Sequence, residues 1–595
     1  MKIVVLVKQV PSLGAVEFDE ETKTLKREGV PLELNVFDRY AVQHAAALRE
    51  QHGGEVVAMT MGPPQAEEAL RECLALGADR AVHLSDKAFA VADTLGTSRT
   101  LALAIAKEGA DLVLCGRKTL DSETWQVPPE VAAFLGWPHV TNAAELECTD
   151  GRVLSLTRET DFGDDVFEVA TPLVASVGRA PAGDAAEGAR DGPITVWTAR
   201  DLVDDFRDDD KRFGQPGSPT RVLAVRDSRP ARKGLQFEDV EAAAQATLDL
   251  LAERRPEADP WEKPRHIAEN PGATYDCWCV VELAAGQPRR ISLELVSRSR
   301  NLAGKLGGKQ VSLVLGTGAE AAAEEVGRHG GELVYTAEEL GEYHPELWAH
   351  AIRIVLERQR PHVLLVPATG RGRDYGPRAA GELELGMTGD CVGVDIARAG
   401  RLLQQKPAYG GNIVSVIMGA TTPQLATVRP RMYDPLEQRD DAEFDVRRLD
   451  LGPLPEPRVR LVERRESRTS YQIDEVDVVS LLGPGLGGAE AIPRIEAEAA
   501  AVGAAVAGTR EACDAGWVDR PAQVGLLGRP VAPRLLVAVG VHGDLEEVGG
   551  FVKARVVVTV GPDDGAPIRE AADVIVEGDW RQTLEPLHRA VAAGL

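Results

Sequence analysis

Short apolar runs alternate with amphipathic stretches along the first part of the chain, and this alternation predicts an α/β fold. Runs rich in β-branched residues predict buried strands at Ile3–Val7, Glu55–Met61, Ala81–Leu84 and Asp111–Cys115. Helical periodicity predicts helices at Ala41–Glu50, Gln65–Leu76 and Thr94–Glu108. Strands that alternate with helices indicate a parallel, doubly wound sheet.

The same order returns later in the chain. The segment Gly308–Gly316 (GKQVSLVLG) resembles Gly54–Gly62 (GEVVAMTMG), and His362–Pro367 (HVLLVP) resembles Asp111–Gly116 (DLVLCG). Each segment is followed by a helical or loop pattern of the same kind. Because the repeat is far longer than a solenoid unit, it indicates duplication of a whole domain.

A third alternating unit follows the proline-rich Pro453–Pro457. Its predicted elements are strands at Asp477–Leu481, Arg534–Val539, Arg555–Val560 and Val574–Val576, and a helix at Ala489–Val502. Two polar stretches rich in Pro or Gly, Ala180–Asp210 and Arg254–Gly272, are predicted linkers. We therefore expect three doubly wound parallel-sheet domains, at residues 1–262, 274–450 and 458–595.

Charge and composition narrow the function classes. The 595 residues carry a formal charge of -26, which disfavours nucleic acid and anionic membranes as partners. No apolar run is long enough for membrane insertion, and the N-terminal run is too short for a signal peptide. The seven scattered cysteines suit a reducing compartment, so a cytoplasmic location is expected. No P-loop, HExxH or nucleophile elbow is present.

One glycine-rich turn indicates a nucleotide site. Gly483-Pro484-Gly485-Leu486-Gly487-Gly488 follows a predicted strand and opens a predicted helix. Backbone N–H groups at such a junction can face a pyrophosphate. Taken alone the motif is weak, because a tight glycine turn has the same sequence.

Several segments together resemble electron-transfer flavoproteins, with the small beta subunit placed ahead of the large alpha subunit. The beta-like segments are Val7–Pro11, Asn35–Asp38, Gly53–Val82 and Asp111–Arg117. The alpha-like segments are Ser292–Leu306, Ala368–Ala380, Asp390–Asp395, Pro407–Asn412 and Ala426–Pro430. The flavin-domain segments are Thr509–Arg510, Asp514–Trp517, Gln523–Gly525 and Val531–Leu535. These segments occur in the family's order across nearly the whole chain.

The resemblance implies an electron carrier rather than a stand-alone enzyme. Two similar α/β domains would form a base under a third domain that holds FAD, and the beta-like domain would hold AMP or a second FAD. Donors would be dehydrogenases of the acyl-CoA dehydrogenase type, as in fatty acid beta-oxidation, and the acceptor a membrane quinone oxidoreductase. The cofactor would supply the redox chemistry, and the protein its binding and electrostatics.

The same resemblance implies a set of flavin-binding positions. They are Gly483, Gly485, Leu486, Thr509, Arg510, Gln523, Val524, Gly525, Leu527, Gly540, His542, Gly543, Glu547 and Asp573. Arg510 would lie against the flavin ring and favour its reduced, anionic form. Asp573 would contact the adenine end.

Some of these positions depart from the family's usual residues. Pro484 stands in place of an arginine, Leu526 and Leu527 in place of Gln and Thr, and Glu547 in place of a histidine. Glu547 would repel an anionic flavin. Either FAD binds through different partners with a shifted potential, or the domain has lost tight flavin binding.

The implied second nucleotide site also differs from the family's usual residues. Its positions are Val7, Asn35, Asp121, Thr124, Gln126 and Val127. Trp125 is bulky where a backbone usually approaches phosphate, and Pro128 removes an N–H donor. Either an adenine nucleotide binds here, or Trp125 fills the site.

Three functions are therefore open: a fused electron carrier, a flavin-less nucleotide-binding or regulatory paralog, and a nicotinamide-dependent dehydrogenase. The last lacks a recognisable acid–base set beside its glycine motif. The stretch Gly178–Arg200 and the acidic Asp201–Asp210 differ from the family's usual segment for docking a dehydrogenase.

Overall fold

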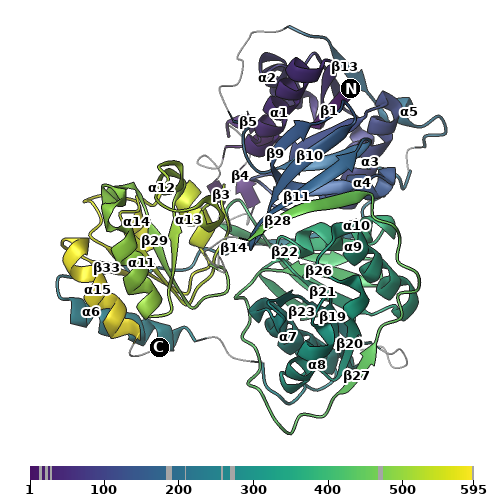
Figure 1. Ribbon diagram of the computed structural model, residues 1–595. Helices are drawn as coiled ribbons and strands as arrows, with labels where there is room; N and C mark the ends of the chain where they lie inside the picture. Colours follow the sequence, from purple (N-terminus) through teal and green to yellow (C-terminus); the bar gives the residue numbers. More distant parts are fainter. Residues whose placement is uncertain are drawn as a thin grey trace.

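Three α/β units make up the computed structural model, which describes residues 1–12, 17–19, 24–26, 30–182, 191–207, 210–255, 259–267, 275–466 and 473–592. Two of the units lie against each other, and the third lies to one side of them (Figure 1). The prediction of a doubly wound α/β fold is confirmed. No helix among the described residues is both long and apolar enough to cross a membrane.

The first unit is built on a ten-stranded sheet with β1 near its centre. Helices α1 (Val36–His52) and α2 (Glu67–Ala75) cover one face, and α3 (Thr94–Glu108) and α4 (Val127–Leu135) cover the other. The strand order is β13 (Ile194–Trp197), β7 (Arg80–Leu84), β6 (Glu55–Met61), β1 (Lys2–Leu6), β8 (Leu112–Gly116), β12 (Leu173–Val177), β9 (His139–Cys148), β10 (Val153–Glu159), β11 (Gly163–Ala170) and β28 (Val459–Glu466).

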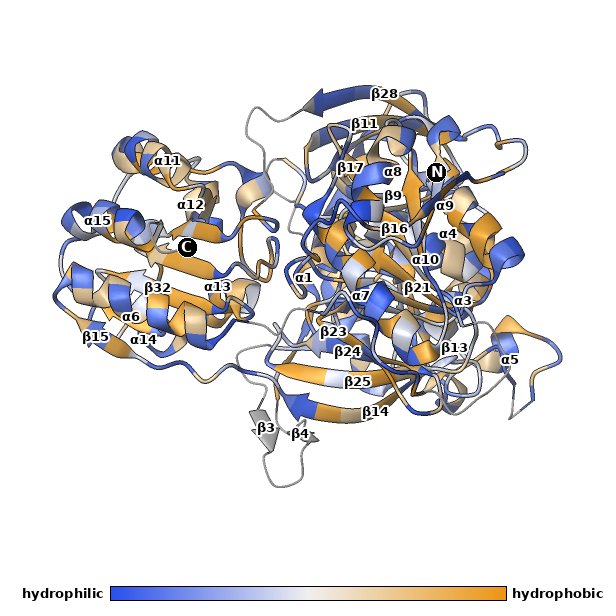
Figure 2. Ribbon diagram, turned by 90° about the horizontal axis from the view of Figure 1, so that it is seen from below, coloured by the Kyte–Doolittle hydropathy of each residue, from blue (hydrophilic) through white to orange (hydrophobic). Residues whose placement is uncertain are grey.

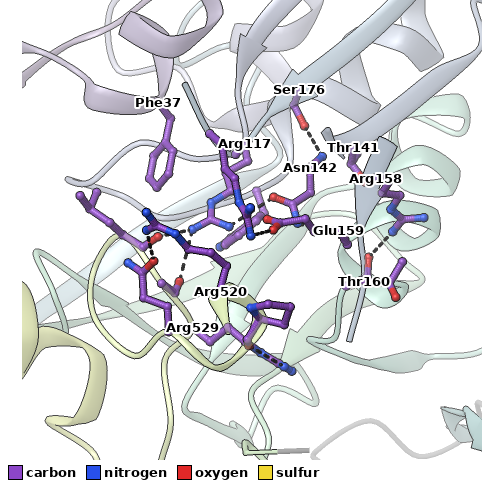
Figure 3. Close-up of a pocket in the computed structure, with 18 of the residues that line it drawn as sticks. Phe37, Arg117, Thr141, Asn142, Arg158, Glu159, Thr160, Ser176, Arg520 and Arg529 are labelled. Carbon is purple, nitrogen blue, oxygen red and sulfur yellow. Dashed lines mark hydrogen bonds and ion pairs between the residues drawn. The ribbon is translucent and has the colours of Figure 1, made fainter. Parts of the chain in front are cut away.

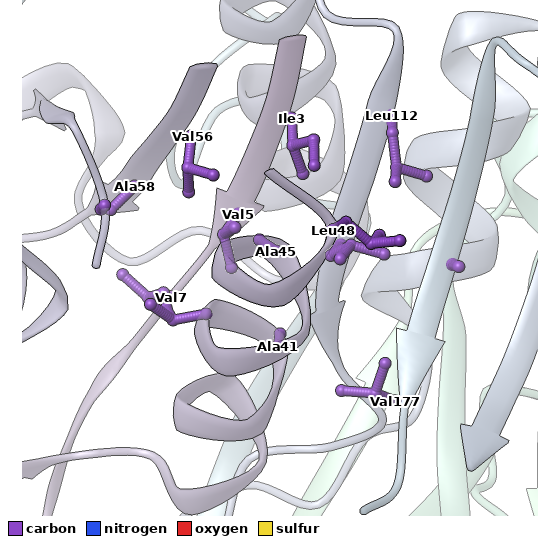
Figure 4. Close-up of a cluster of buried hydrophobic side chains, with 14 of the residues drawn as sticks. Ile3, Val5, Val7, Ala41, Ala45, Leu48, Val56, Ala58, Leu112 and Val177 are labelled. Atoms are coloured by element: carbon purple, nitrogen blue, oxygen red, sulfur yellow. The ribbon is translucent and has the colours of Figure 1, made fainter. Parts of the chain in front are cut away.

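The core of this unit forms where apolar side chains of the sheet pack against those of the helices. Ile3, Val5 and Leu112 point from the sheet toward Ala45 and Leu48 of α1 (Figure 4). Buried parallel strands have two apolar faces, which is why β1 and β8 read as unbroken apolar runs. Their burial fixes the helices on both faces of the sheet.

Local signals set the ends of α3, as its sequence predicts. The Asp93 carboxylate accepts a hydrogen bond from the Gly96 N–H at 2.9 Å, which caps the first turn. The helix ends at Gly109, whose φ of 74° suits a residue without a Cβ.

The second unit repeats the first. Its sheet runs β22 (Met387–Cys391), β26 (Gln424–Val428), β21 (Val363–Pro367), β16 (Cys277–Val281), β19 (Gln310–Leu315), β20 (Leu333–Ala337) and β27 (Asp445–Arg448). Its main helices are α7 (Arg290–Leu306), α8 (Ala319–Arg328), α9 (Pro345–Ile354) and α10 (Gly372–Glu382). β19 and β21 flank β16 as β6 and β8 flank β1, so the predicted duplication is confirmed.

The two units exchange one strand with each other. A four-stranded antiparallel sheet beside the second unit runs β14 (Thr220–Asp227), β25 (Ile413–Gly419), β24 (Leu402–Ala408) and β23 (Gly393–Ile396). Strand β14 comes from the first half of the chain, whereas β28, from the second half, pairs with β11 of the first unit. Figure 1 shows the green β28 lying along the blue β11.

The third unit is an all-parallel sheet of six strands. Its order is β15 (Leu235–Phe237), β33 (Val574–Val576), β32 (Val556–Val560), β31 (Leu535–Val539), β29 (Val478–Leu482) and β30 (Ala505–Gly508). One face carries α6 (Val240–Glu253), α11 (Ile492–Ala501) and α15 (Trp580–Ala592), and α12 (Arg510–Asp514), α13 (Leu545–Phe551) and α14 (Ile568–Ala571) complete the unit. Its strands are mostly apolar, and its helices carry both polar and apolar residues (Figure 2).

Several segments pack on a unit other than the one in which the sequence places them. β14, β15 and α6 belong to the predicted 1–262 domain. β14 and β15 pair with strands of the other units, α6 packs on the third unit, and β28 joins the first sheet. The local sequence of a strand does not determine which sheet the strand joins. The predicted domain boundaries therefore remain predictions, and segments from one predicted domain pack against another unit.

A buried polar cluster joins the two base units. The Asp374 carboxylate accepts hydrogen bonds from Tyr343 at 2.6 Å and contacts His139 at 2.6 Å and Arg158 at 2.9 Å. Burial opposes ionisation of Asp374, but Arg158 and His139 hold its pKa well below its usual range. Each charge in this cluster has a partner from the other unit, which fixes how the units dock.

Candidate functional site

The carboxyl ends of the parallel strands in the third unit gather most of the predicted flavin-binding residues. Gly483 follows β29, Thr509 follows β30, and Gly540 follows β31. The Gly485 N–H donates to the Gly540 carbonyl at 2.8 Å, and a Cβ at Gly485 would lie 2.9 Å from the Gly540 Cα. These glycines therefore allow two loops to touch, at the edge where α/β sheets bind ligands.

The outer part of the glycine turn is open. Gly487 and Gly488 have φ values of 84° and 158°, and a Cβ on either would meet nothing within 4 Å. Pro484 leaves this turn without a side-chain cation at its second position. Leu486 is buried in the core below, so it supports the turn rather than facing a ligand.

A pocket of about 330 Å³ lies beside this edge, where all three units meet. The first unit contributes Phe37, Arg117 and Asn142, the second Arg373, and the third Arg520 and Arg529, among other residues (Figure 3). Its charged lining consists of seven arginines, at 117, 158, 179, 373, 510, 520 and 529, and three acids, at 159, 161 and 514. In a chain of net charge -26, this pocket is a local positive field.

Arg117 ties the first unit to the third at this pocket. Its Nη2 donates to the Leu527 carbonyl at 2.7 Å, and its Nη1 donates to the Asn142 side chain at 3.2 Å. Burial, together with Arg373 and Arg179, lowers the pKa of Arg117 to about 9. Burial is the main cause of this shift, and the two neighbouring guanidinium groups add to it.

Trp125 forms an aromatic wall of the same pocket. The guanidinium carbons of Arg373 and Arg117 lie 4.6 and 5.1 Å from its ring, and Arg117 also lies 4.6 Å from the Phe37 ring. Trp125 adopts a φ of 61°, which places its backbone in the left-handed region. The tryptophan is thus held among cations, which favour contact with aromatic faces.

Arg510 and Gln523 are the predicted flavin residues that meet the pocket with polar side chains. The Arg510 side chain is 43% exposed and lies 3.5 Å from Asp514 and 3.7 Å from Glu546. The Gln523 Oε1 accepts a hydrogen bond from Arg520 at 2.9 Å. Among the described residues no acceptor binds the Gln523 amide N–H groups, so these can face a ligand while the oxygen is held.

The two leucines of the neighbouring loop differ in environment. Leu526 is 2% exposed and packs with Phe37 and Leu120 of the first unit. Leu527 lines the pocket. Gly525 precedes them with a φ of 145°, and Val524 is buried in the core. Leu526 therefore acts as an apolar contact between units, and only Leu527 faces the pocket.

Glu547 carries less negative charge than its sequence position suggests. Its carboxyl accepts a hydrogen bond from the Gly543 N–H at 2.5 Å, and burial raises its pKa to about 7. His542 is exposed, while Thr509 is buried and donates to Glu511 at 3.0 Å. Near neutral pH Glu547 is only partly ionised, so the repulsion expected from the sequence is reduced.

Asp573 lies at the wrong end of the sheet to contact adenine. It precedes β33, at the amino end of the strand, and its side chain is fully buried. Arg232 and Arg254 pair with it at 2.8 Å each. The prediction failed because the residue's register along the strand could not be read from the motif. Two acids, Glu577 and Asp579, follow the carboxyl end of β33.

The predicted second nucleotide positions are largely occupied by neighbouring groups. Asn35 donates to the Lys118 carbonyl at 3.0 Å, Asp121 pairs with Lys8 at 2.6 Å, and Gln126 donates to the Met387 carbonyl at 3.0 Å. Val7 directly precedes Lys8 in the chain, and Thr124 and Val127 lie within two positions of Gln126. None of the six predicted residues lines the 330 Å³ pocket or a second cavity of about 340 Å³.

A buried carboxylate fills the centre of that loop. Glu123 pairs with Lys118 at 2.9 Å and lies 3.6 Å from Arg429, and the Gly410 N–H donates to it at 3.3 Å. Although burial opposes its ionisation, Lys118 and Arg429 lower its pKa. The residues present do not fit a nucleotide phosphate here, because cations and an N–H that could hold one already bind Glu123.

The third-unit edge, by contrast, fits a flavin dinucleotide. The open turn at Gly487–Gly488 can approach a pyrophosphate, and the adjoining pocket offers Arg510, Gln523 and Leu527 to a ring system. The cationic pocket could not be predicted from the sequence, because its residues come from all three units. No group of three or more His, Cys, Asp or Glu side chains in the described ranges is placed to hold a metal.

Family models match most of the chain. An electron transfer flavoprotein domain matches residues 22–202 and 277–453, and an electron transfer flavoprotein FAD-binding domain matches residues 472–552. The first model alone spans more than half of the 595 residues.

Three relatives are each similar to part of the chain. An electron transfer flavoprotein subunit beta of Clostridium acetobutylicum is 42% identical over 228 residues, 37% of this chain and 86% of the relative. An electron transfer flavoprotein subunit alpha of Thermoanaerobacterium thermosaccharolyticum is 31% identical over 310 residues, 51% of this chain and 94% of the relative. Protein FixA of Azorhizobium caulinodans is 37% identical over 276 residues, 44% of this chain and 96% of the relative.

Proposed function

Because this chain belongs to the electron transfer flavoprotein family and joins beta-like and alpha-like parts in one polypeptide, we propose that it carries electrons from dehydrogenases to a quinone oxidoreductase through one bound FAD. The observation that supports this most directly is the cationic pocket beside the open glycine turn. Bound there, FAD would supply the redox chemistry.

The chain's own residues would tune that cofactor by charge. Arg510 lines the pocket where the ring would bind, and Arg117, which is buried, adds a second positive charge in the same pocket. Both favour added negative charge on a ligand, an effect strengthened where water is excluded. Glu546 beside Arg510 acts in the opposite direction. The balance of these charges sets the direction in which the potential shifts.

The proposed donors are dehydrogenases of the acyl-CoA dehydrogenase type, which would connect the protein with fatty acid beta-oxidation in the cytoplasm. The acidic chain suits partners with basic docking faces. The atypical segment at residues 178–200 lies partly outside the described residues; its described part forms β13 at the edge of the first sheet and begins α5 (Ala199–Leu202). AMP or a second FAD has less support, since Glu123 occupies the cations of that loop.

The test is the absorbance spectrum of the purified protein, with the nucleotides released by denaturation identified and counted. One FAD per chain, with the two flavin absorbance bands, supports the proposal. A colourless protein that stays colourless after incubation with FAD would contradict it and favour the flavin-less paralog. Two FAD per chain would contradict the filled second site.

Partners require a separate assay. The oxidised protein is mixed with a catalytic amount of an acyl-CoA dehydrogenase and its substrate, and bleaching of the flavin bands is followed. Reduction only when both are present supports this donor class. Reduction by NADH alone would instead indicate a nicotinamide donor.

A further inference from the structure

A second cavity, of about 340 Å³, lies between the third unit and the antiparallel sheet that contains β14. Arg226 and Ser228 at the end of β14, Arg431 after β26, and Lys553 and Arg555 before β32 line it, with part of β24 and β25. Figure 1 places β14 where the third unit meets the other two. The cavity lies at the amino ends of the third-unit strands, opposite the proposed flavin edge.

Positive charge dominates this cavity. Four cations line it, at residues 226, 431, 553 and 555, against one acid, Asp227. Asp227 is already paired with Arg229 at 2.6 Å. In a chain with 93 acidic and 67 basic residues, such a cluster runs against the overall charge.

Two acids pair with side chains of these cations, and each also faces another arginine. Asp434 lies 3.5 Å from Arg555 but is also paired with Arg290 at 3.1 Å. Asp477 contacts Arg431 and lies 3.8 Å from Arg534. Each acid is thus shared between two arginines.

Within the described ranges, two cationic side chains in the cavity are incompletely paired: Arg431 lacks one hydrogen bond, and Lys553 lacks an ion pair. The Arg431 side chain is 1% exposed, and its Nε has no hydrogen-bond partner in the described part of the chain. Lys553 donates to the Ser228 carbonyl at 3.1 Å, but no carboxylate among the described residues lies within ion-pair distance of it. Burial, with Arg429 and Arg232 nearby, lowers the pKa of Lys553 to about 8. A buried donor without a partner in the chain can receive an acceptor from outside it, such as a water molecule or a ligand.

The remaining lining limits the kind of ligand. Val392, Val414, Val416 and Met432 form an apolar wall, and none of the described lining residues is an aromatic that could stack on a base. A volume of about 340 Å³ lies at the lower end of small-molecule sites. We propose that this cavity binds a small phosphate ester, with its phosphate on Lys553 and Arg431 and its carbon chain along Val414 and Val416.

Such a ligand would bridge two units. Arg431 comes from the second unit and Lys553 from the third, so a phosphate held by both would strengthen this docked arrangement. Charge-assisted hydrogen bonds from lysine and arginine to phosphate are among the strongest that a protein offers. The proposed phosphate site does not depend on the flavin, because it lies at the amino ends of the third-unit strands and the flavin edge lies at their carboxyl ends.

Isothermal titration of the full chain, with its flavin bound and in phosphate-free buffer, tests the site. The probes are inorganic phosphate and glycerol 3-phosphate, with ionic strength held constant by chloride. We expect both to bind saturably at one per chain without displacing flavin, glycerol 3-phosphate more tightly. Lys553→Met should weaken binding about tenfold or more.

Two further variants keep the test decisive. Arg226→Gln removes an exposed lining cation and should weaken binding several-fold even if Lys553→Met folds poorly. Lys87→Met, an exposed lysine of the first unit, should leave both affinities unchanged. Absence of saturable binding, equal binding by wild type and both cavity variants, or binding of inorganic phosphate without the ester would overturn the proposal.

Discussion

The Arg117 Nη2 lies 2.7 Å from the carbonyl oxygen of Leu527 and donates a hydrogen bond to it across the boundary between the first and third units. Arg117 also lies over the rings of Phe37 and Trp125. One buried guanidinium thus fixes the loop that faces the pocket. The placement of the proposed flavin site depends on a residue 410 positions away from that loop.

Replacing Arg117 should therefore loosen the flavin. In Arg117→Met the Leu527 carbonyl loses its donor and the pocket loses one positive charge, so the dissociation constant for FAD should rise by about tenfold. Fluorescence titration of the flavin-depleted protein with FAD measures it. Arg117→Lys keeps the positive charge but not the planar guanidinium, so its dissociation constant for FAD should lie between those of wild type and Arg117→Met. Unchanged affinity in both variants would contradict this role.

The two leucines of the loop should respond differently to truncation. Leu526→Ala removes an apolar contact buried against Phe37 and Leu120, and should lower the free energy of unfolding by about 2 to 4 kcal/mol. Leu527→Ala, on a pocket-lining residue, should lower it by less than about 1 kcal/mol. Urea denaturation followed by tryptophan fluorescence compares them. Equal losses would show that Leu526 does not join the units.

Glu130 should make stability fall as pH rises. Burial, and then the nearby Asp93, raise its pKa to about 8, while Ser98 and Thr94 donate to it at 2.9 and 3.2 Å. Its folded-state pKa lies above the unfolded value of about 4.5, so the protonated form is favoured by folding. That contribution is complete below the unfolded pKa and is lost as pH rises toward 8, at about 1.4 kcal/mol per pH unit.

Glu130→Gln should remove this slope. The free energy of unfolding of the variant, relative to wild type, should increase between about pH 5 and pH 8 and then stay constant. Chemical denaturation across this range measures it, with the exposed Glu68→Gln as the matched control. A constant difference at all pH values would show that the Glu130 carboxyl is not protonated in the folded protein.

Arg510 and Glu546 should shift the flavin potential in opposite directions. Arg510→Gln removes a positive charge from the pocket and should make the potential more negative, by roughly 20 to 60 mV. Glu546→Gln removes the acid 3.7 Å from Arg510 and should make it more positive. Spectroelectrochemical titration measures both, and the exposed Arg494→Gln should change nothing. Shifts of the same sign in the first two variants would contradict the assignment.

The parallel sheets and the duplication were predictable because they follow from local pattern. Unbroken apolar runs such as β1 and β8 identify buried strands wherever they occur, and the β19 and β21 repeats follow the same rule. The glycine turn at Gly483 was predictable for the same reason. These features depend on neighbours within one strand or turn.

The errors concern contacts between distant residues. The sequence reads Leu526 as a lost polar partner of the flavin, but its neighbours Phe37 and Leu120 come from the start of the chain. Asp573 matches a short motif, yet Arg232 and Arg254 decide its environment. The 330 Å³ pocket combines arginines from three units, so no single stretch of sequence carries its signal.

The reciprocal exchange of β14 and β28 also constrains how the protein is made. During translation β11 is synthesised long before its partner β28. More than half of the chain is synthesised between β15 and its partner β33. The first unit therefore cannot finish its sheet edge, nor β14 find its partner strand, until later parts have left the exit tunnel. Open strand edges in the nascent protein would need shielding from other chains, and assembly of the three units would be completed together near the end of translation.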